Sequence, residues 1–190
     1  MSESPAPASW QGKTVRLRAV DSTDWAAFFA ADGDTDAARN GWHVPMPRSM
    51  ARARAWAEEQ AARQPSAADD NWYWAIADAE GGPVGSISTH GCDRRNGNFE
   101  YGIAIFREHW GRGYAPSAIE LMLRFMFGER RYHKCNSHVY AFNERSLRMH
   151  EEFGFVPEGR IRDQIFTAGR HYDSVILGIT APEFFARYGR

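Results

Sequence analysis

A glycine pair between a predicted strand and a predicted amphipathic helix constrains this chain more than any other feature. The stretch is REHWGRGYAPSA, with Gly111 and Gly113 on either side of one arginine. It follows the predicted strand FEYGIAIF and precedes a helix predicted over about residues 115–127, where apolar residues recur at i, i+3, i+4 and i+7. A strand that passes through glycines into such a helix is typical of a mixed α/β layer structure.

The physics of this junction favours an anion. The first amides of a helix have no intrahelical partners, and the helix dipole puts partial positive charge there. Gly111 and Gly113 lack the Cβ atoms that would keep an anion from the backbone, and Pro116 gives up no useful donor. A phosphate or pyrophosphate site is therefore one interpretation, and a plain strand-to-helix turn is the other. Neither GxxxxGK[ST] nor the third glycine of GxGxxG is present, which argues against a P-loop or Rossmann turn.

The remaining chain predicts strands and helices in the order β-α-α-β-β-β-α-β-α-β-β. Asp21 and Ser49 are expected to cap the first two helices, and Gly154 to end the last one. The interval between those first two helices, about 33–48, is polar and is expected to be irregular. The expected strands cover about 13–20, 72–77, a stretch from 84, 99–106, 134–141, 155–166 and 171–179. The expected helices run from the cap at 21 through 29, and over about 50–63, 115–127 and 143–153, with a terminal helical turn at 183–188.

Length and composition indicate one soluble domain. A chain of 190 residues is expected to bury roughly 70% of its unfolded surface. The formal net charge of −1 gives no drive towards nucleic acid, and no apolar run reaches the length of a membrane helix. Cys92 and Cys135 have no metal-ligand spacing and are expected to be reduced thiols. We expect a disordered lead over residues 1–12, a single domain over 13–190, and a cytoplasmic location with neither a nucleic-acid nor a membrane partner.

Three ordered motifs resemble those of the GCN5-related N-acetyltransferases, the GNAT family. The glycine stretch is similar to the family's (Q/R)xxGxG/A signature, except that Glu108 stands at the Gln/Arg position, with Arg107 one place earlier. NERSLRMHEEFGF, starting at Asn143, is similar to the family's N-x-x-S…GF segment, and EGRIRD with the later Gly169 and Asp173 resembles the third. The resemblance spans about residues 13–180 and fits the branch of ribosomal-protein and spermidine acetyltransferases.

The resemblance implies the fold and the donor site. It implies an α/β fold with a central, mostly antiparallel mixed sheet of about seven strands flanked by helices, and acetyl-CoA as co-substrate. The strand before the glycines would hydrogen-bond the pantetheine arm, the glycine loop would hold the pyrophosphate, and Asn143 and Ser146 would contact the pantetheine. Arg148 would reach the adenosine phosphate end, or is an exposed helix arginine. The implied contacts of the strand and loop are Ile103, Ala104, Ile105, Arg107, Gly111, Arg112, Gly113, Tyr114 and Ala115.

The chemistry implied is acetyl transfer to an amine, which must be neutral to attack. An amine with a pKa of ~10.4 is only about 0.04% neutral at pH 7, against about 14% for an α-amine near 7.8. Glu100 stands where related enzymes carry a strand glutamate, as base or amine anchor. His150 replaces the family tyrosine that protonates the departing thiolate, and is equally well read as a helix-face histidine. Ser146 and Tyr140 are the other candidate acids.

The acceptor side is open at this point. Acids at 32, 34, 36, 58, 59, 69 and 70 and aromatics at 42, 43, 56, 72 and 74 suit a cationic amine, or form a solvated face over a tryptophan-containing core. The alternatives are a polyamine, an antibiotic amine or a peptide N-terminus. A catalytically weak acyl-CoA sensor, an interaction protein on the same fold, and a homodimer also stay open. The other histidines have no shared helical spacing, so no metal is expected.

Overall fold

One sheet of seven strands organises the part of the chain that the structure, a computed structural model, describes: residues 10–41, 43–66 and 68–189. The spatial order is β1-β2-β3-β4-β5-β7-β6, and every neighbouring pair is antiparallel except β4 and β5. This confirms the predicted mixed, mostly antiparallel sheet. The strands are β1 (Arg16–Arg18), β2 (Tyr73–Ala77), β3 (Pro83–Asp93), β4 (Asn98–Ile105), β5 (Lys134–Tyr140), β6 (Val156–Thr167) and β7 (Arg170–Thr180).

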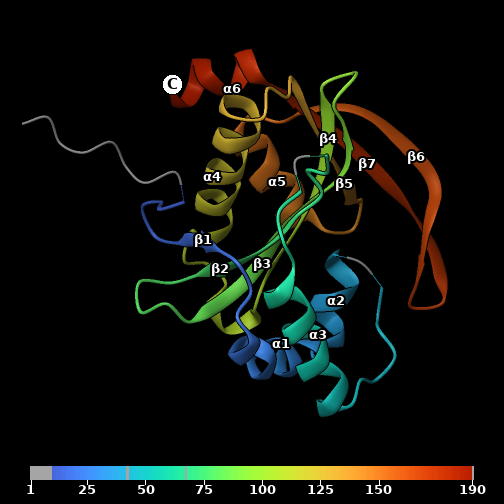
Figure 1. The fold of residues 1–190 in the computed structure, drawn as a ribbon. Coiled ribbons are helices and arrows are strands. Elements are labelled where there is room, and N and C mark those ends of the chain that lie inside the picture. Colours follow the sequence, from blue (N-terminus) through green and yellow to red (C-terminus); the bar gives the residue numbers. More distant parts are fainter. Residues whose placement is uncertain (1–9, 42, 67, 190) are drawn as a thin grey trace, which may run out of the picture.

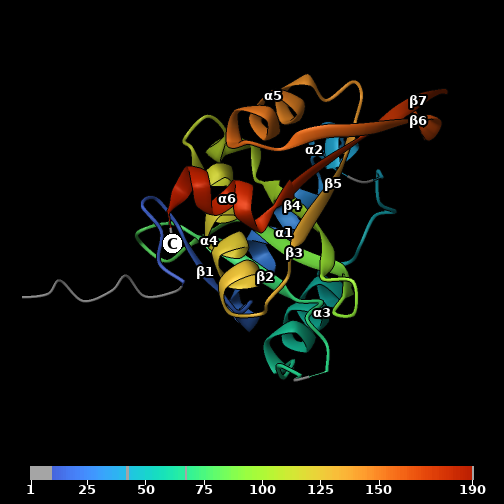
Figure 2. The ribbon, with the colours of Figure 1, turned by 90° about the horizontal axis from the view of Figure 1, so that it is seen from above.

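Six α-helices flank the sheet within these ranges. In Figure 1, α1, α2 and α3 gather at the lower end, while α4, α5 and α6 gather at the upper end. Figure 2, seen from above, shows the β6–β7 hairpin extending well beyond the helices. The helices are α1 (Trp25–Asp32), α2 (Thr35–Gly41), α3 (Met50–Ala62), α4 (Tyr114–Gly128), α5 (Glu144–Phe153) and α6 (Ala181–Tyr188).

The predicted helix boundaries hold where a capping residue marks them. The Asp21 side chain accepts a hydrogen bond from the amide of Thr23 at 2.9 Å, at the start of the short 3-10 turn η1 (Ser22–Asp24) that leads into α1. Ser49 caps α3 through the amide of Arg52. Gly154 ends α5 with a φ of +116°, a conformation that glycine adopts without strain.

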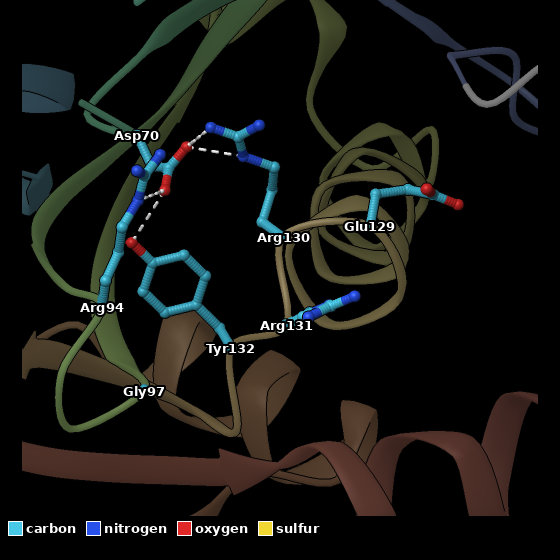
Figure 3. A pocket seen from close by; sticks show the side chains of 7 residues that line it. All are labelled: Asp70, Arg94, Gly97, Glu129, Arg130, Arg131 and Tyr132. Atoms are coloured by element: carbon cyan, nitrogen blue, oxygen red, sulfur yellow. Dashed lines mark hydrogen bonds and ion pairs between the residues drawn. The ribbon is translucent and has the colours of Figure 1, made fainter. Parts of the chain in front are cut away.

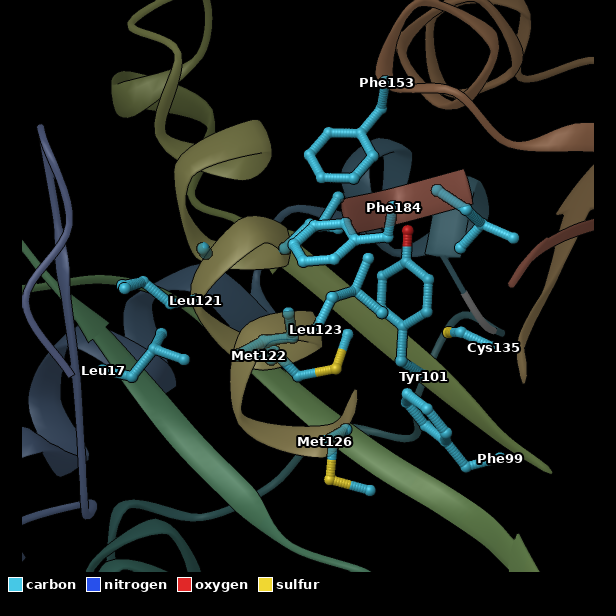
Figure 4. Close-up of a cluster of buried hydrophobic side chains, with 14 of the residues drawn as sticks. Leu17, Phe99, Tyr101, Leu121, Met122, Leu123, Met126, Cys135, Phe153 and Phe184 are labelled. Atoms are coloured by element: carbon cyan, nitrogen blue, oxygen red, sulfur yellow. The ribbon is translucent and has the colours of Figure 1, made fainter. Parts of the chain in front are cut away.

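The stripe predicted on α4 makes the core. Ala118, Ile119, Met122, Leu123 and Met126 are fully buried. They pack against the β4 face that carries Phe99 and Tyr101, as Figure 4 shows, with Phe153 and Phe184 closing the cluster from α5 and α6. Because residues alternate faces along a strand, Glu100, Gly102 and Ala104 lie on the opposite face of β4.

Two parts of the chain differ from the prediction. The interval at 33–48 contains α2, a short helix in which no residue is buried and whose start is capped by Asp34 through the amide of Ala37 at 3.0 Å. Trp10 to Gly12, assigned to the lead, belong to the fold: Trp10 packs at a tilt against Phe125 with ring centroids 4.6 Å apart, and Gln11 bridges to Arg16. The rest of the predicted lead, residues 1–9, lies outside the described residues.

The sheet opens between its only parallel pair. β4 and β5 are in register from Asn98 opposite Lys134 to Glu100 opposite Asn136, and no further. Past that point β4 keeps pairing with β3 as far as Ile105, and β5 keeps pairing with β7 as far as Tyr140. The two halves of the sheet therefore part after Glu100 and Asn136. The β5-facing edge of residues 101–105 of β4 has no strand partner.

Candidate functional site

The glycine loop presents an open backbone at the start of α4. Gly111 and Gly113 have φ angles of +76° and +73°, and a Cβ built at either position would meet no atom within 4 Å. Gly113 is the N-cap residue of α4, and no side chain caps the first amides of this helix. The loop thus combines free helix amides with the space that a side chain would fill. This arrangement fits an anion such as a phosphate group.

Trp110 fixes the loop to the end of β4. Its indole Nε1 donates to the carbonyl oxygen of Ile105 at 2.7 Å. The ring lies between two guanidinium groups, with the Cζ of Arg145 at 3.8 Å and that of Arg107 at 4.9 Å from the ring centroid. Burial, and then repulsion from Arg107, lower the pKa of Arg145. Arg145 lies inside the NERS segment, but neither its charge nor its spacing marks it as a site residue in the sequence.

A cavity of about 270 Å³ connects the loop to the start of α5. Asn143 caps α5, with its Oδ1 accepting from the amide of Ser146 at 3.1 Å, while its Nδ2 donates to the carbonyl of Asn40 at 2.9 Å. Of the two predicted pantetheine contacts, Asn143 lines this cavity together with Trp110, which precedes the glycines, while Ser146 does not line it. The cavity is lined by Asn40, Trp110, Phe142, Asn143, Glu144 and Arg145.

Arg107 is held away from the loop. It forms a two-pronged ion pair with Asp34, with its Nη2 at 2.7 Å from Oδ1. This pair, together with the amide of Ala37, lowers the pKa of Asp34 to about 2. Arg107 therefore ties the start of α2 to the segment before the glycines, and its predicted contribution of charge at the phosphates stays a prediction. Arg112, by contrast, is exposed and donates only to the carbonyl of Glu108, at 3.2 Å.

Arg148 occupies an exposed turn of α5. Its Nη1 lies 3.3 Å from Glu144 Oε2, and both side chains are largely in solvent. Such an i,i+4 pair is an ordinary feature of a helix surface and contributes about 0.3–0.5 kcal/mol. The geometry favours the exposed-arginine interpretation over a contact to the adenosine phosphate.

His150 is a buried residue, with only 2% of its surface exposed. Its Nδ1 lies 2.7 Å from the carbonyl oxygen of Ser146, so this nitrogen carries the proton and donates. Its Nε2 is then the acceptor, and it lies 2.6 Å from the hydroxyl of Tyr101 and 3.0 Å from that of Ser137, which share its single lone pair. Burial lowers the pKa of His150, partly offset by the bond to Ser146, and keeps the ring neutral. These contacts favour a packing role over that of the acid.

Replacing His150 with phenylalanine should lower the free energy of unfolding by about 2–3 kcal/mol, because the hydroxyls of Tyr101 and Ser137 would lose a buried acceptor. Urea denaturation measures this loss. Adding Tyr101→Phe should cost less than the sum of the two single losses, since the double variant leaves fewer unpaired groups. Strictly additive losses would contradict the network, and a kcat near that of the wild type would confirm the packing role.

The predicted acidic face is largely neutralised. Asp32 pairs with Arg48, Asp34 with Arg107, and Asp36 with Arg39. The tryptophans are dispersed as well: Trp74 is in the main core, Trp56 packs edge-on against Phe28, and Trp72 lies under Arg63. Trp42, the remaining tryptophan of the predicted acceptor side, lies outside the described residues.

Asp70 belongs to a different part of the molecule. Figure 3 shows its carboxylate between Arg94, Arg130 and the hydroxyl of Tyr132, beside a cavity of about 360 Å³. Arg130 follows the C-terminus of α4, whereas the glycines precede its N-terminus. A helix of 15 residues is about 22 Å long, so this cavity and the glycine loop lie at opposite ends of α4.

Glu100 lies on the β4 face opposite the core, directly across from His90 of β3 and Asn136 of β5. It stands at the last paired position before β4 and β5 part.

Among the described residues, no cluster of three or more His, Cys, Asp or Glu side chains is arranged to hold a metal ion. Within the same residues no helix has the length and apolar character needed to cross a bilayer.

Comparison with known proteins gives a matching family and several relatives of this chain. The family model described as acetyltransferase (GNAT) domain matches residues 14–156. The chain is 38% identical over 180 residues to YokL, an uncharacterized N-acetyltransferase from the SPbeta prophage of Bacillus subtilis (strain 168), covering 95% of this chain and 97% of that protein. It is 30% identical over 112 residues to the spermidine N(1)-acetyltransferase of Vibrio cholerae, covering 59% of this chain and 65% of the relative.

Solved structures share the fold. The crystal structure of spermidine N-acetyltransferase from Vibrio cholerae in complex with CoA and spermine superposes with a TM-score of 0.77 at 21% identity, covering 90% of this chain and 98% of that one. The acetyltransferase (GNAT family) from Bacillus anthracis gives a TM-score of 0.75 at 19% identity, over 91% and 98% of the two chains. The predicted fold is thereby confirmed.

Proposed function

Because this chain belongs to the acetyltransferase (GNAT) family, we propose that it moves the acetyl group of acetyl-CoA to a primary amine by direct attack in a ternary complex. The observation that carries the proposal is the open cradle at Gly111 and Gly113, next to the unpaired edge of β4. Acetyl-CoA supplies an acetyl group activated as a thioester. The cradle offers backbone N–H groups to the pyrophosphate of acetyl-CoA, and the unpaired strand edge offers main-chain hydrogen bonds to the amides of its pantetheine arm.

This chain holds the donor with groups that are fixed before it binds. The amides of Gly111 to Ala115 bind the pyrophosphate, and Arg112 adds positive charge. The backbone of Ile103 to Ile105 hydrogen-bonds the pantetheine, and Asn143 and Ser146 border it from α5. Trp110 keeps the cradle in place through its bond to Ile105. Preorganised donors of this kind cost no rearrangement on binding.

The acceptor enters over the other face of β4. Glu100 serves there as base or amine anchor, and Gly102 and Ala104 leave the strand surface beside it low. Ser146 or Tyr140 takes the acid role in place of His150, whose Nδ1 proton is directed at a backbone carbonyl. The amine is a small molecule, such as a polyamine or an antibiotic, or a protein N-terminus.

An amine panel tests this function. Thiol release from acetyl-CoA is followed with spermidine, spermine, aminoglycosides, amino acids and peptides with free N-termini. Turnover of at least one amine, together with saturable acetyl-CoA binding, is the expected result. Binding of acetyl-CoA without turnover of any amine would instead support the acyl-CoA sensor, and absence of binding would contradict both.

Glu100→Gln should lower kcat/KM for the best amine of that panel by roughly 10²–10⁴-fold if the carboxylate acts in proton transfer. The loss should be largest below the pKa of the substrate amine, where most of the amine is protonated, and should shrink above it. Initial rates across pH 6–10 measure this. A small loss of the same size at every pH would remove Glu100 from the mechanism.

A further inference from the structure

Three titratable side chains from three adjacent strands meet on the acceptor face of the sheet. His90 of β3 is directly opposite Glu100 of β4, and Glu100 is opposite Asn136 of β5. His138, two residues beyond Asn136, shares its face because strand residues alternate sides. The side chains of His90, Glu100 and His138 are 50%, 40% and 38% exposed, so solvent and a substrate can reach all three.

Each oxygen of the Glu100 carboxylate lies near the imidazole ring of a different histidine. His90 Nε2 lies 3.5 Å from Oε2, and His138 Nε2 lies 3.7 Å from Oε1. These distances are longer than an ordinary hydrogen bond and within the range of an ion pair, which forms when an imidazole takes up a proton. The carboxylate is thus placed to stabilise a proton on either ring.

The two histidines differ in position relative to the parting of the sheet. His138 lies on β5 beyond the last residue pair with β4, and so borders the gap between these strands. His90 lies on β3, on the far side of β4 from that gap. Gly102, the next residue of β4 on the same face, has no side chain to fill the surface beside them. His138 is therefore the ring that adjoins both the donor edge of β4 and the acceptor face.

The ordinary base strengths of a carboxylate and an imidazole distinguish the role of Glu100 from that of the two histidines. An ordinary imidazole is a stronger base than an ordinary carboxylate by about two pKa units, so it takes a proton from an ammonium about 100-fold more favourably. Glu100 is not the group that accepts the proton of the ammonium, because its negative charge is used to stabilise the imidazolium that forms when a ring takes up that proton.

We propose that His138 accepts the proton that the substrate ammonium must lose, with Glu100 holding the resulting imidazolium and His90 positioning the second carboxylate oxygen. The inference rests on the proposed function and assigns proton acceptance within that site. An N–H bond of the ammonium breaks, its electron pair stays on nitrogen, and the proton joins Nε2 of His138. The nitrogen then attacks the thioester carbonyl, the C–S bond breaks, and the sulfur takes the second proton lost by nitrogen. The imidazolium finally returns its proton to solvent.

Glutamine substitutions separate proton acceptance from positioning, because glutamine keeps a hydrogen-bonding side chain and cannot take up a proton. With an amine that the wild type acetylates, His138→Gln should lower kcat by roughly 10²–10⁴-fold and leave the Kd of acetyl-CoA unchanged. His90→Gln should lower kcat less. His138→Gln combined with Glu100→Gln should be little worse than His138→Gln alone, since the carboxylate acts through that ring. His171→Gln on the exposed end of β7 is the matched control and should behave as the wild type.

Three results would overturn the inference and leave the proposed function standing. Wild-type kcat in His138→Gln would do so, as would equal losses in His138→Gln and His90→Gln. A loss in His138→Ala that glutamine restores would show positioning alone. In each of these cases the wild type still acetylates its amine and the proposed function stands. A wild type that binds acetyl-CoA and acetylates no amine would overturn the transfer and the role of His138 together.

Discussion

Gly113→Val should weaken acetyl-CoA binding by roughly 10²-fold, or about 2.7 kcal/mol, because the valine side chain would fill the space proposed for the pyrophosphate. That space holds no protein atom within 4 Å of an added Cβ. Gly113 also has a φ of +73°, where a β-branched residue is strained, and because this strain is present with and without acetyl-CoA it lowers stability rather than affinity. Isothermal titration with acetyl-CoA measures the change in Kd.

Gly169→Val supplies the matched control. Gly169, in the turn between β6 and β7, has a φ of +80° and also has no atom within 4 Å of an added Cβ. The same strain should therefore lower the stability of both variants by a similar amount, while acetyl-CoA binding should change only in Gly113→Val. Wild-type affinity in Gly113→Val would contradict the cradle. Equal loss of affinity in both variants would assign the effect to strain alone.

The donor side of the site was predictable because its information is local. The apolar stripe of α4, the two glycines and the Gly154 end of α5 each occupy a short stretch of sequence, and the structure shows all three as predicted. Each follows from a rule about neighbouring residues, either helical periodicity or the left-handed backbone that glycine adopts. The motif resemblance added the identity of the donor, which periodicity alone could not supply.

Helix α2 was not predicted from the sequence, and it illustrates what rules about neighbouring residues overlook. It has no buried residue, so it carries no apolar stripe for a periodicity argument to find. It is tied instead at both ends by contacts distant in sequence: Asp34 to Arg107, and Asn40 to Asn143. Both partners belong to the donor motifs. α2 therefore connects the segment before the glycine loop with the start of α5.

The chemistry of the histidines was equally out of reach of the sequence. The burial of His150 depends on Tyr101 of β4 and Ser137 of β5, which surround its Nε2 and lie far from it in the sequence. His90 and His138 gain a role only from the register that places both beside Glu100. A sheet assembles such groups from separate strands, and the sequence alone does not specify which strands are neighbours.

Asp70→Ala should lower the free energy of unfolding by about 3–4 kcal/mol, towards the range measured when one partner of a buried ion pair is removed. The Asp70 side chain is only 4% exposed and bonds Arg94 Nε at 2.6 Å, Arg130 Nε at 2.6 Å and the Tyr132 hydroxyl at 3.0 Å. It thereby joins the segment before β2 to the β3–β4 turn and to the end of α4. The expected loss stays below 5 kcal/mol because both arginines are partly exposed and regain water.

The effect should depend on pH in a defined direction. Burial raises the pKa of the Asp70 carboxyl, but hydrogen bonds from Arg94, Arg130 and Tyr132 outweigh it and bring the pKa below its usual value. A carboxyl whose pKa is lower in the folded state stabilises that state above the unfolded pKa near 3.9, and loses this as pH falls through the folded pKa. The difference between the wild type and Asp70→Ala should therefore be constant above about pH 5 and shrink below about pH 4.

Urea denaturation at several pH values tests this, with Asp36→Ala as the control. Asp36 also pairs with an arginine, Arg39, but its side chain is 75% exposed, so its removal should cost less than about 1 kcal/mol. Because Asp70 lies at the far end of α4 from the glycines, acetyl-CoA affinity should be unchanged in the folded Asp70→Ala variant. If Asp70→Ala were no less stable than Asp36→Ala, the ion pairs of Asp70 would merely offset the cost of burying its charge.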